Sequence, residues 1–135
     1  MKMRKRQLAA VLTVTLLLLS GCSRIRIDDT GNAALRYSSM AVGDDTKFTQ
    51  LLTEEETLRV KEFLSAGKHL PTGVGCPFTE EISVAFGGQL FAIGWDGCPT
   101  VRLANSDGTF EYYEISQEGL DYITALFEKY ADRAN

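Results

Sequence analysis

Residue types that carry much of enzyme chemistry are scarce in this chain. It holds one histidine, three cysteines and three prolines among 135 residues. It has no G-x-S-x-G or H-E-x-x-H motif and no glycine-rich phosphate loop after an expected strand. Hydrolases and metalloenzymes usually need a nucleophile with its base, a cluster of metal ligands or paired carboxylates in a cleft. The sequence therefore makes catalysis the less favoured class, and it predicts no metal site and no cofactor.

Basic residues are also scarce once the first 21 residues are set aside. Four of the fourteen Lys and Arg lie within residues 1–6, which leaves ten from residue 22 onward against eighteen Asp and Glu, a net charge of −8. Phosphate backbones repel such a protein, and no stripe of Lys and Arg interrupts the negative charge. We expect no nucleic-acid partner.

The first 21 residues have the layout of a secretory signal peptide. A basic start precedes an apolar run over residues 8–19, and small residues follow up to Cys22. The apolar run is shorter than the ~20 residues that a permanent membrane-spanning helix needs. The segment 1–21 is therefore expected to direct export and to be removed.

The end of this segment, Leu19-Ser20-Gly21-Cys22, resembles the lipobox of bacterial lipoproteins. The resemblance implies cleavage before Cys22 and diacylation of its sulfur. Two acyl chains give the stable anchoring that one chain does not. We therefore expect the protein on the outer side of a cell membrane or in the outer membrane, held there by its lipid. An ordinary signal peptide with a chance cysteine is the alternative.

The remaining cysteines, Cys76 and Cys98, form an even pair in an exported protein, which favours a disulfide. The expected strands 82–86 and 89–95 are joined by two glycines, which suits a hairpin turn. If this hairpin keeps one register, the two sulfurs meet within a residue at its open end. A metal or redox site that recruits His69 is a weaker alternative, because neither cysteine lies in a C-x-x-C motif.

Two helix starts are marked by capping residues. Thr53-Glu54-Glu55-Glu56 is a capping box, so a helix should begin there and end near Gly67. Ser116 caps a second helix whose apolar residues recur at helical spacing. The sequence predicts four further strands or hairpin arms: 33–40, 47–52, 100–104 and 109–115.

These elements predict an α+β fold in which two helices pack on one face of an antiparallel sheet. The sheet is expected to contain a hairpin followed by a three- to four-stranded meander. Residues 22–32 are polar and turn-rich and are assigned to the lipidated N-terminus and a short tether, although Ile25 and Ile27 alternate with arginines as in a short strand. Residues 33–135 then form a single domain.

Some motifs resemble a domain of small uncharacterised lipoproteins from Gram-positive bacteria. They are Cys76-Pro77-Phe78, Asp96-Gly97-Cys98 and Phe127-Glu128-Lys129-Tyr130. The resemblance spans about the last sixty residues, and it implies no known activity.

The candidate binding face consists of Trp95, Asp96, Tyr112 and Tyr113. Exposed Trp and Tyr are enriched in recognition sites, and an adjacent disulfide would hold such a surface in place. The alternative is that the aromatic side chains fill the core. Neighbouring residues of a strand point to opposite faces, so at least one tyrosine is expected to be structural.

Two functions from different classes follow from these features. The first is a membrane-tethered, non-enzymatic interaction module that binds an envelope protein or an extracellular ligand; it predicts an exposed aromatic patch or an uncovered sheet edge. The second is a small-ligand-binding protein or enzyme that uses Asp96, His69 and nearby acids; it predicts a concave pocket in which these groups converge.

Overall fold

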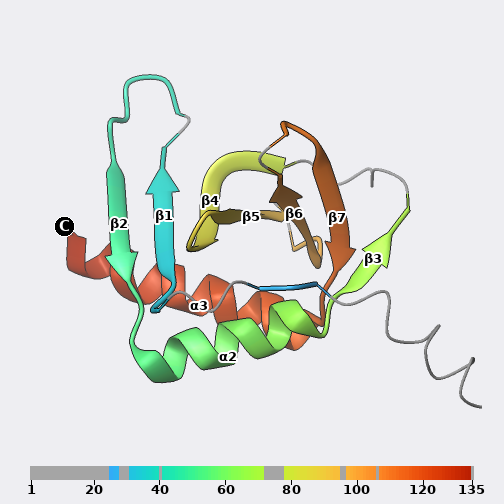
Figure 1. Cartoon of the computed structure of the whole chain (residues 1–135). Helices are drawn as coiled ribbons and strands as arrows, with labels where there is room; N and C mark the ends of the chain where they lie inside the picture. Colours follow the sequence, from blue (N-terminus) through green and yellow to red (C-terminus); the bar gives the residue numbers. More distant parts are fainter. Residues whose placement is uncertain are drawn as a thin grey trace, which may run out of the picture.

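Two helices and seven strands make up the described part of the chain. The structure is a computed structural model, and it describes residues 25–27, 31–39, 41–71, 78–94, 97–105 and 107–134. The elements are β1 (Ala34–Ser38), β2 (Lys47–Leu51), α2 (Glu54–Ser65), β3 (Lys68–Leu70), β4 (Phe78–Phe86), β5 (Gln89–Gly94), β6 (Thr100–Ala104), β7 (Phe110–Glu114) and α3 (Gln117–Ala134). Figure 1 shows both helices on the same side of the sheet, so the predicted α+β fold is confirmed.

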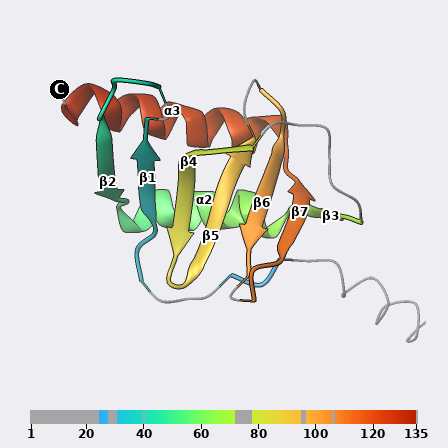
Figure 2. The ribbon, with the colours of Figure 1, turned by 90° about the horizontal axis from the view of Figure 1, so that it is seen from above.

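The strands form one antiparallel sheet in the order β2-β1-β4-β5-β6-β7-β3. Figure 2 shows them side by side across the two helices. The expected first hairpin is β1–β2, and the expected meander is β4–β7. Pairing of β1 with β4 joins the two units into a single sheet.

Both predicted helix starts are present. The hydroxyl of Thr53 accepts a hydrogen bond from the Glu56 amide at 3.2 Å, and the Glu56 carboxylate accepts one from the Thr53 amide at 3.0 Å. The hydroxyl of Ser116 accepts from the Gly119 amide at 3.1 Å. These bonds satisfy amide groups that have no partner within the first turn of a helix. Local sequence therefore sets where each helix begins.

The hairpin β4–β5 departs from the uniform register that the sequence suggested. Phe86 pairs with Gln89 as predicted, and this register holds back to the pair Ser83–Ala92. It then shifts, because Phe78 pairs with Gly94: four residues of β4 lie between these two pairs against one residue of β5. The extra residues bend β4, as a bulge does, and the bend is visible in both views (Figure 1, Figure 2). The extrapolation from Phe86 to the cysteines is therefore wrong beyond Ser83.

The core lies between the helices and one face of the sheet. Its fully buried side chains include Leu35 of β1, Phe91 of β5, Val60 of α2 and Ile123 of α3. Alternate residues along the strands supply the sheet side of this core. Burial of such side chains is the main stabilising contribution to the fold.

Packing begins earlier in the chain than the predicted domain boundary at residue 33. Ile25 is 6% exposed and belongs to the core cluster, and Ile27 packs against that cluster. The Ile25 side chain can pack against Gly67 because Gly67 has no side chain: a Cβ added there would lie 3.1 Å from the Ile25 Cδ1 atom. The assignment of these residues to a tether is therefore corrected. The segment packs on the domain because the apolar side chains of Ile25 and Ile27 gain more from contact with the core than its polar composition suggested.

The two helices approach closely where Gly119 of α3 meets Phe63 of α2. A Cβ at Gly119 would lie 2.9 Å from both the Cβ and the Cγ atom of Phe63. We expect Gly119→Ala to lower the free energy of unfolding by about 1 to 2 kcal/mol, since overpacking outweighs the ~1 kcal/mol gain in helix propensity. Urea unfolding followed by circular dichroism measures this change. Gly88→Ala is the matched control, because a Cβ there meets no atom within 4 Å; equal stability of the two variants would contradict the close packing.

Candidate functional site

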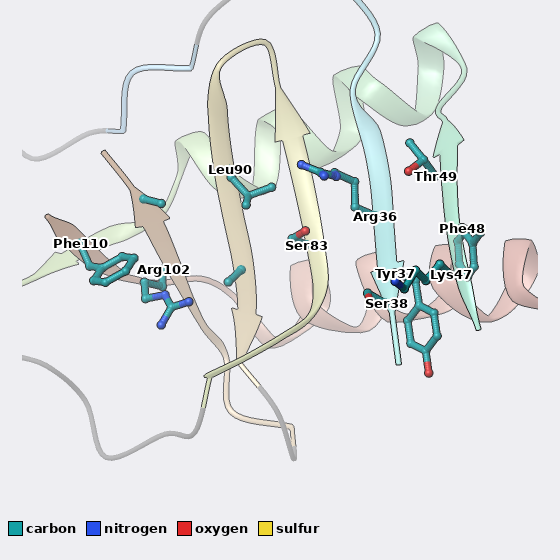
Figure 3. A pocket seen from close by; sticks show the side chains of 12 residues that line it. Arg36, Tyr37, Ser38, Lys47, Phe48, Thr49, Ser83, Leu90, Arg102 and Phe110 are labelled. Atoms are coloured by element: carbon teal, nitrogen blue, oxygen red, sulfur yellow. The ribbon is translucent and has the colours of Figure 1, made fainter. Parts of the chain in front are cut away.

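The face of the sheet opposite the helices carries a cavity of about 520 Å³. Residues of β1, β2, β4, β5, β6 and β7 line it. Figure 3 views the sheet with the helices behind it, and it shows Arg36 and Arg102 on either side of the hairpin β4–β5. We call this surface the open face and define it by Arg36, Lys47, Ser83, Ala92, Arg102 and Phe110.

Small residues form the floor of the cavity. Arg36 pairs with Ser83, Ser83 with Ala92, and Ala92 with Arg102, so these four residues lie in one row across β1, β4, β5 and β6. Residues paired in this way project from the same face of a sheet. Two short side chains thus separate two arginines, and the hollow lies above them.

The side of the cavity at β1 and β2 is cationic. Arg36 and Lys47 are exposed, and neither forms an ion pair within the described part of the chain. None of the described residues that line the cavity is acidic. Arg36 and Lys47 therefore place two positive charges beside the cavity, and no acidic side chain among its described lining residues balances them.

The other side of the cavity is a stack of rings around Arg102. Its guanidinium carbon lies 4.4 Å from the centre of the Phe110 ring and 5.6 Å from that of the Phe78 ring. Phe110 is 47% exposed. Contact of a guanidinium with aromatic faces is favourable and holds the flat group in one orientation. This end of the open face presents both an aromatic surface and a fixed cation.

The predicted aromatic rim is only partly within the described residues. Trp95 and Asp96 lie outside them. Tyr112 is half-buried on the open face, where it pairs with Arg102 and its ring centre lies 5.6 Å from that of Phe78. Tyr113 is 7% exposed and belongs to the core, and burial raises the pKa of its hydroxyl, with Glu111 adding to the shift. Tyr113 is thus placed in the core and not at a recognition surface.

The cysteine assignments rest on residues that the structure describes only in part. Cys98 is half-buried just before β6, and its sulfur accepts a hydrogen bond from the Thr100 hydroxyl at 3.3 Å. Cys76 and the lipid site Cys22 lie outside the described residues. The disulfide Cys76–Cys98 and the acylation of Cys22 remain predictions.

The structure does not bring His69 to the open-face cavity. His69 is exposed on β3, an edge strand, and its ring stands edge-on to Tyr113 at 5.3 Å. Over the described ranges, no group of three or more His, Cys, Asp or Glu is placed to hold a metal ion. The carboxylates of Asp44 and Asp107 have pKa values lowered by hydrogen bonds from Thr46 and Thr109, which lie two residues further along the chain. These two acids stabilise turns.

Sequence reasoning missed the cations of the open face. Arg102 stands between Val101 and Leu103, and Arg36 between Leu35 and Tyr37, so each occupies the outward position of an alternating strand. That pattern shows that both side chains point away from the core. It does not show that they share a cavity, because 66 positions separate them and the strand order brings them together.

In the part of the chain that the structure describes, no helix is both long and apolar enough to cross a membrane. Comparison of the chain with known proteins finds no family model, no curated protein and no solved structure that matches it.

Proposed function

We propose that this chain is an extracytoplasmic lipoprotein whose folded part is a non-enzymatic binding module. Acyl chains on Cys22 hold it at a membrane, and the open face is its binding surface. The lipobox resemblance and the leader support the anchor. One observation carries the binding function: both helices pack on the same face of the sheet, and the other face has a cavity lined by Arg36, Lys47 and Phe110.

An antiparallel sheet often has one face in water, and such a face is usually covered by polar side chains. The open face differs from that pattern at its floor. Ala92 and Ala104 line the cavity together with Leu90, and Phe110 is exposed at its edge. A concave, partly apolar surface with a few charged groups is the common form of a ligand site. The open face therefore resembles a ligand-binding site more than it resembles the usual water-covered face of a sheet.

The anchor is tested by the intact mass of the protein extracted from membranes. We expect the mass of a chain that begins at Cys22 and carries diacylglycerol. Cys22→Ser should retain residues 1–21 and lack acyl groups, because the lipid attaches to the sulfur. Ser23→Ala, a neighbouring substitution that leaves the sulfur, should match the wild type. An unacylated wild-type chain would remove the anchor from the proposal.

The binding surface is tested by filling the cavity. Ala104→Trp places a large ring over its floor, whereas Leu58→Trp changes a side chain that is 59% exposed on α2, in the other layer. Envelope components cross-linked to the wild type should be recovered equally with Leu58→Trp and reduced at least about tenfold with Ala104→Trp. Equal recovery with both variants would exclude the open face.

The same capture experiment tests the aromatic rim predicted from the sequence. If Trp95 contributes to recognition, Trp95→Ala should reduce recovery as Ala104→Trp does. Recovery at the wild-type level with Trp95→Ala would restrict the binding surface to the open face.

A further inference from the structure

The charge of the open face is opposite to that of the protein. From Cys22 onward the net charge is −8, yet two exposed cations, Arg36 and Lys47, line the cavity, and none of its described lining residues is acidic. Positive groups gathered in a concavity produce a local potential that attracts anions, even on an acidic protein. The ligand of this surface should therefore be negatively charged.

The cavity has two chemically different ends. Arg36 and Arg102 are three strand spacings apart in one row, about 14 Å between their Cα atoms at ~4.8 Å per strand. Lys47 adds a second cation on the side of Arg36. The far end has the exposed Phe110 ring stacked with the Arg102 guanidinium. An anionic group suits the first end, and a flat apolar group suits the second.

The size and the backbone of the cavity favour a small molecule over a peptide. Its volume of about 520 Å³ lies within the ~300 to 1,000 Å³ range of small-molecule sites. The strands of its floor, β1, β4, β5 and β6, each have a paired strand on both sides. A peptide bound by strand addition needs unpaired backbone groups, which occur at the edge of a sheet. The open face offers side chains and no such edge at its centre.

We propose that this cavity binds a small organic anion that consists of a carboxylate or similar acidic group on a flat apolar body. The acidic group contacts Arg36 and Lys47, and the body lies over Ser83 and Ala92 against the ring of Phe110. This inference rests on the proposed function, because it names the ligand class of the same open face.

The test compares two probes that share the same flat ring and nearly the same shape, one of them anionic and the other neutral. Binding of 2-naphthoate and of its neutral amide, 2-naphthamide, is measured by isothermal titration calorimetry on the native lipoprotein in maltoside micelles, with empty micelles as the blank. We expect the wild type to bind 2-naphthoate at least about tenfold more tightly than 2-naphthamide, since the carboxylate alone can form ion-paired hydrogen bonds with Arg36 and Lys47.

Variants locate the binding. The double variant Arg36→Ala, Lys47→Ala should lose at least about tenfold in affinity for 2-naphthoate and little for 2-naphthamide. Arg133→Ala removes an exposed cation near the end of α3, in the other layer, and should change neither affinity. Lys47→Glu is a single exposed substitution that should also weaken 2-naphthoate. Thermal unfolding followed by circular dichroism checks that each variant is folded.

Three results would overturn the inference. If both probes bind equally and Ala104→Trp abolishes both, the open face is a binding surface without selectivity for anions, and the proposed function stands. If neither probe binds to the cavity, or 2-naphthoate binds the double variant as it binds the wild type, the ligand class is wrong. The cross-linking result with Ala104→Trp then decides the proposed function by itself.

Discussion

Replacing Glu56 with glutamine is expected to lower the free energy of unfolding by about 2 to 3 kcal/mol at pH 7. Glu56 is 7% exposed, and its carboxylate accepts hydrogen bonds from the Lys129 amine at 2.7 Å and from the Tyr130 hydroxyl at 2.8 Å. It also closes the capping box with Thr53. One carboxylate thus connects the first turn of α2 to the last turns of α3.

The pKa of Glu56 shows how strongly these partners favour its charged form. Burial disfavours the charge, but the hydrogen bonds from Lys129, the Thr53 amide and Tyr130, together with the charge of Lys129, outweigh burial and hold the pKa at about 2. The ordinary value is 4.5. Because the pKa is lower in the folded state, the stabilisation is complete above pH 4.5 and is lost as the pH falls through 2.

The stability difference between wild type and Glu56→Gln should therefore shrink as the pH falls from 5 to 2. Urea unfolding at several pH values measures it. Glu62→Gln is the control, because the Arg59–Glu62 pair is 45% and 69% exposed at its two side chains. An exposed pair of this kind contributes no more than about 0.5 kcal/mol. A pH-independent difference for Glu56→Gln would contradict the role of its charge.

Loss of the predicted disulfide is the second large effect. We expect the double variant Cys76→Ser, Cys98→Ser to be less stable than the oxidised wild type by about 3 kcal/mol, the loop-closure value for a crosslink over a loop of this length. The constraint acts on the unfolded chain, so the estimate does not depend on the register that the structure corrects. The predicted disulfide would link the strand that follows Cys76 to the strand that follows Cys98.

Thiol titration of the denatured protein, with and without a reductant, tests the pairing. If Cys22 carries the proposed lipid, the wild type should show no reactive thiol before reduction and two after it, because the lipid blocks the third cysteine. A single variant, Cys98→Ser, should expose the thiol of Cys76. Two reactive thiols in the unreduced wild type would remove the disulfide.

Features that depend on neighbouring residues could be predicted from the sequence. The capping box at Thr53, the Ser116 cap and the turn at Gly87 each set the end of an element through contacts within a few residues. The α+β class followed from these local signals.

Features that depend on distant pairing could not be predicted. β3 has three residues, Lys68–Leu70, and it is a strand because it pairs with β7 more than forty positions later. The shift between Phe78 and Ser83 likewise reflects how β4 bends within the sheet. The cavity shows the same limit, because the strand order that places Arg36 and Arg102 in one row depends on pairing between distant segments.

The burial of Ile25 restricts how far the protein can reach from a lipid on Cys22. Three residue steps separate the two positions, and a fully extended chain spans at most ~3.6 Å per residue, so a lipid on Cys22, as proposed, would be attached within about 11 Å of Ile25. Such a distance is comparable to the thickness of a lipid headgroup layer. The module would therefore rest on the bilayer surface with little freedom to tumble, and any ligand would have to approach it along or just above that surface.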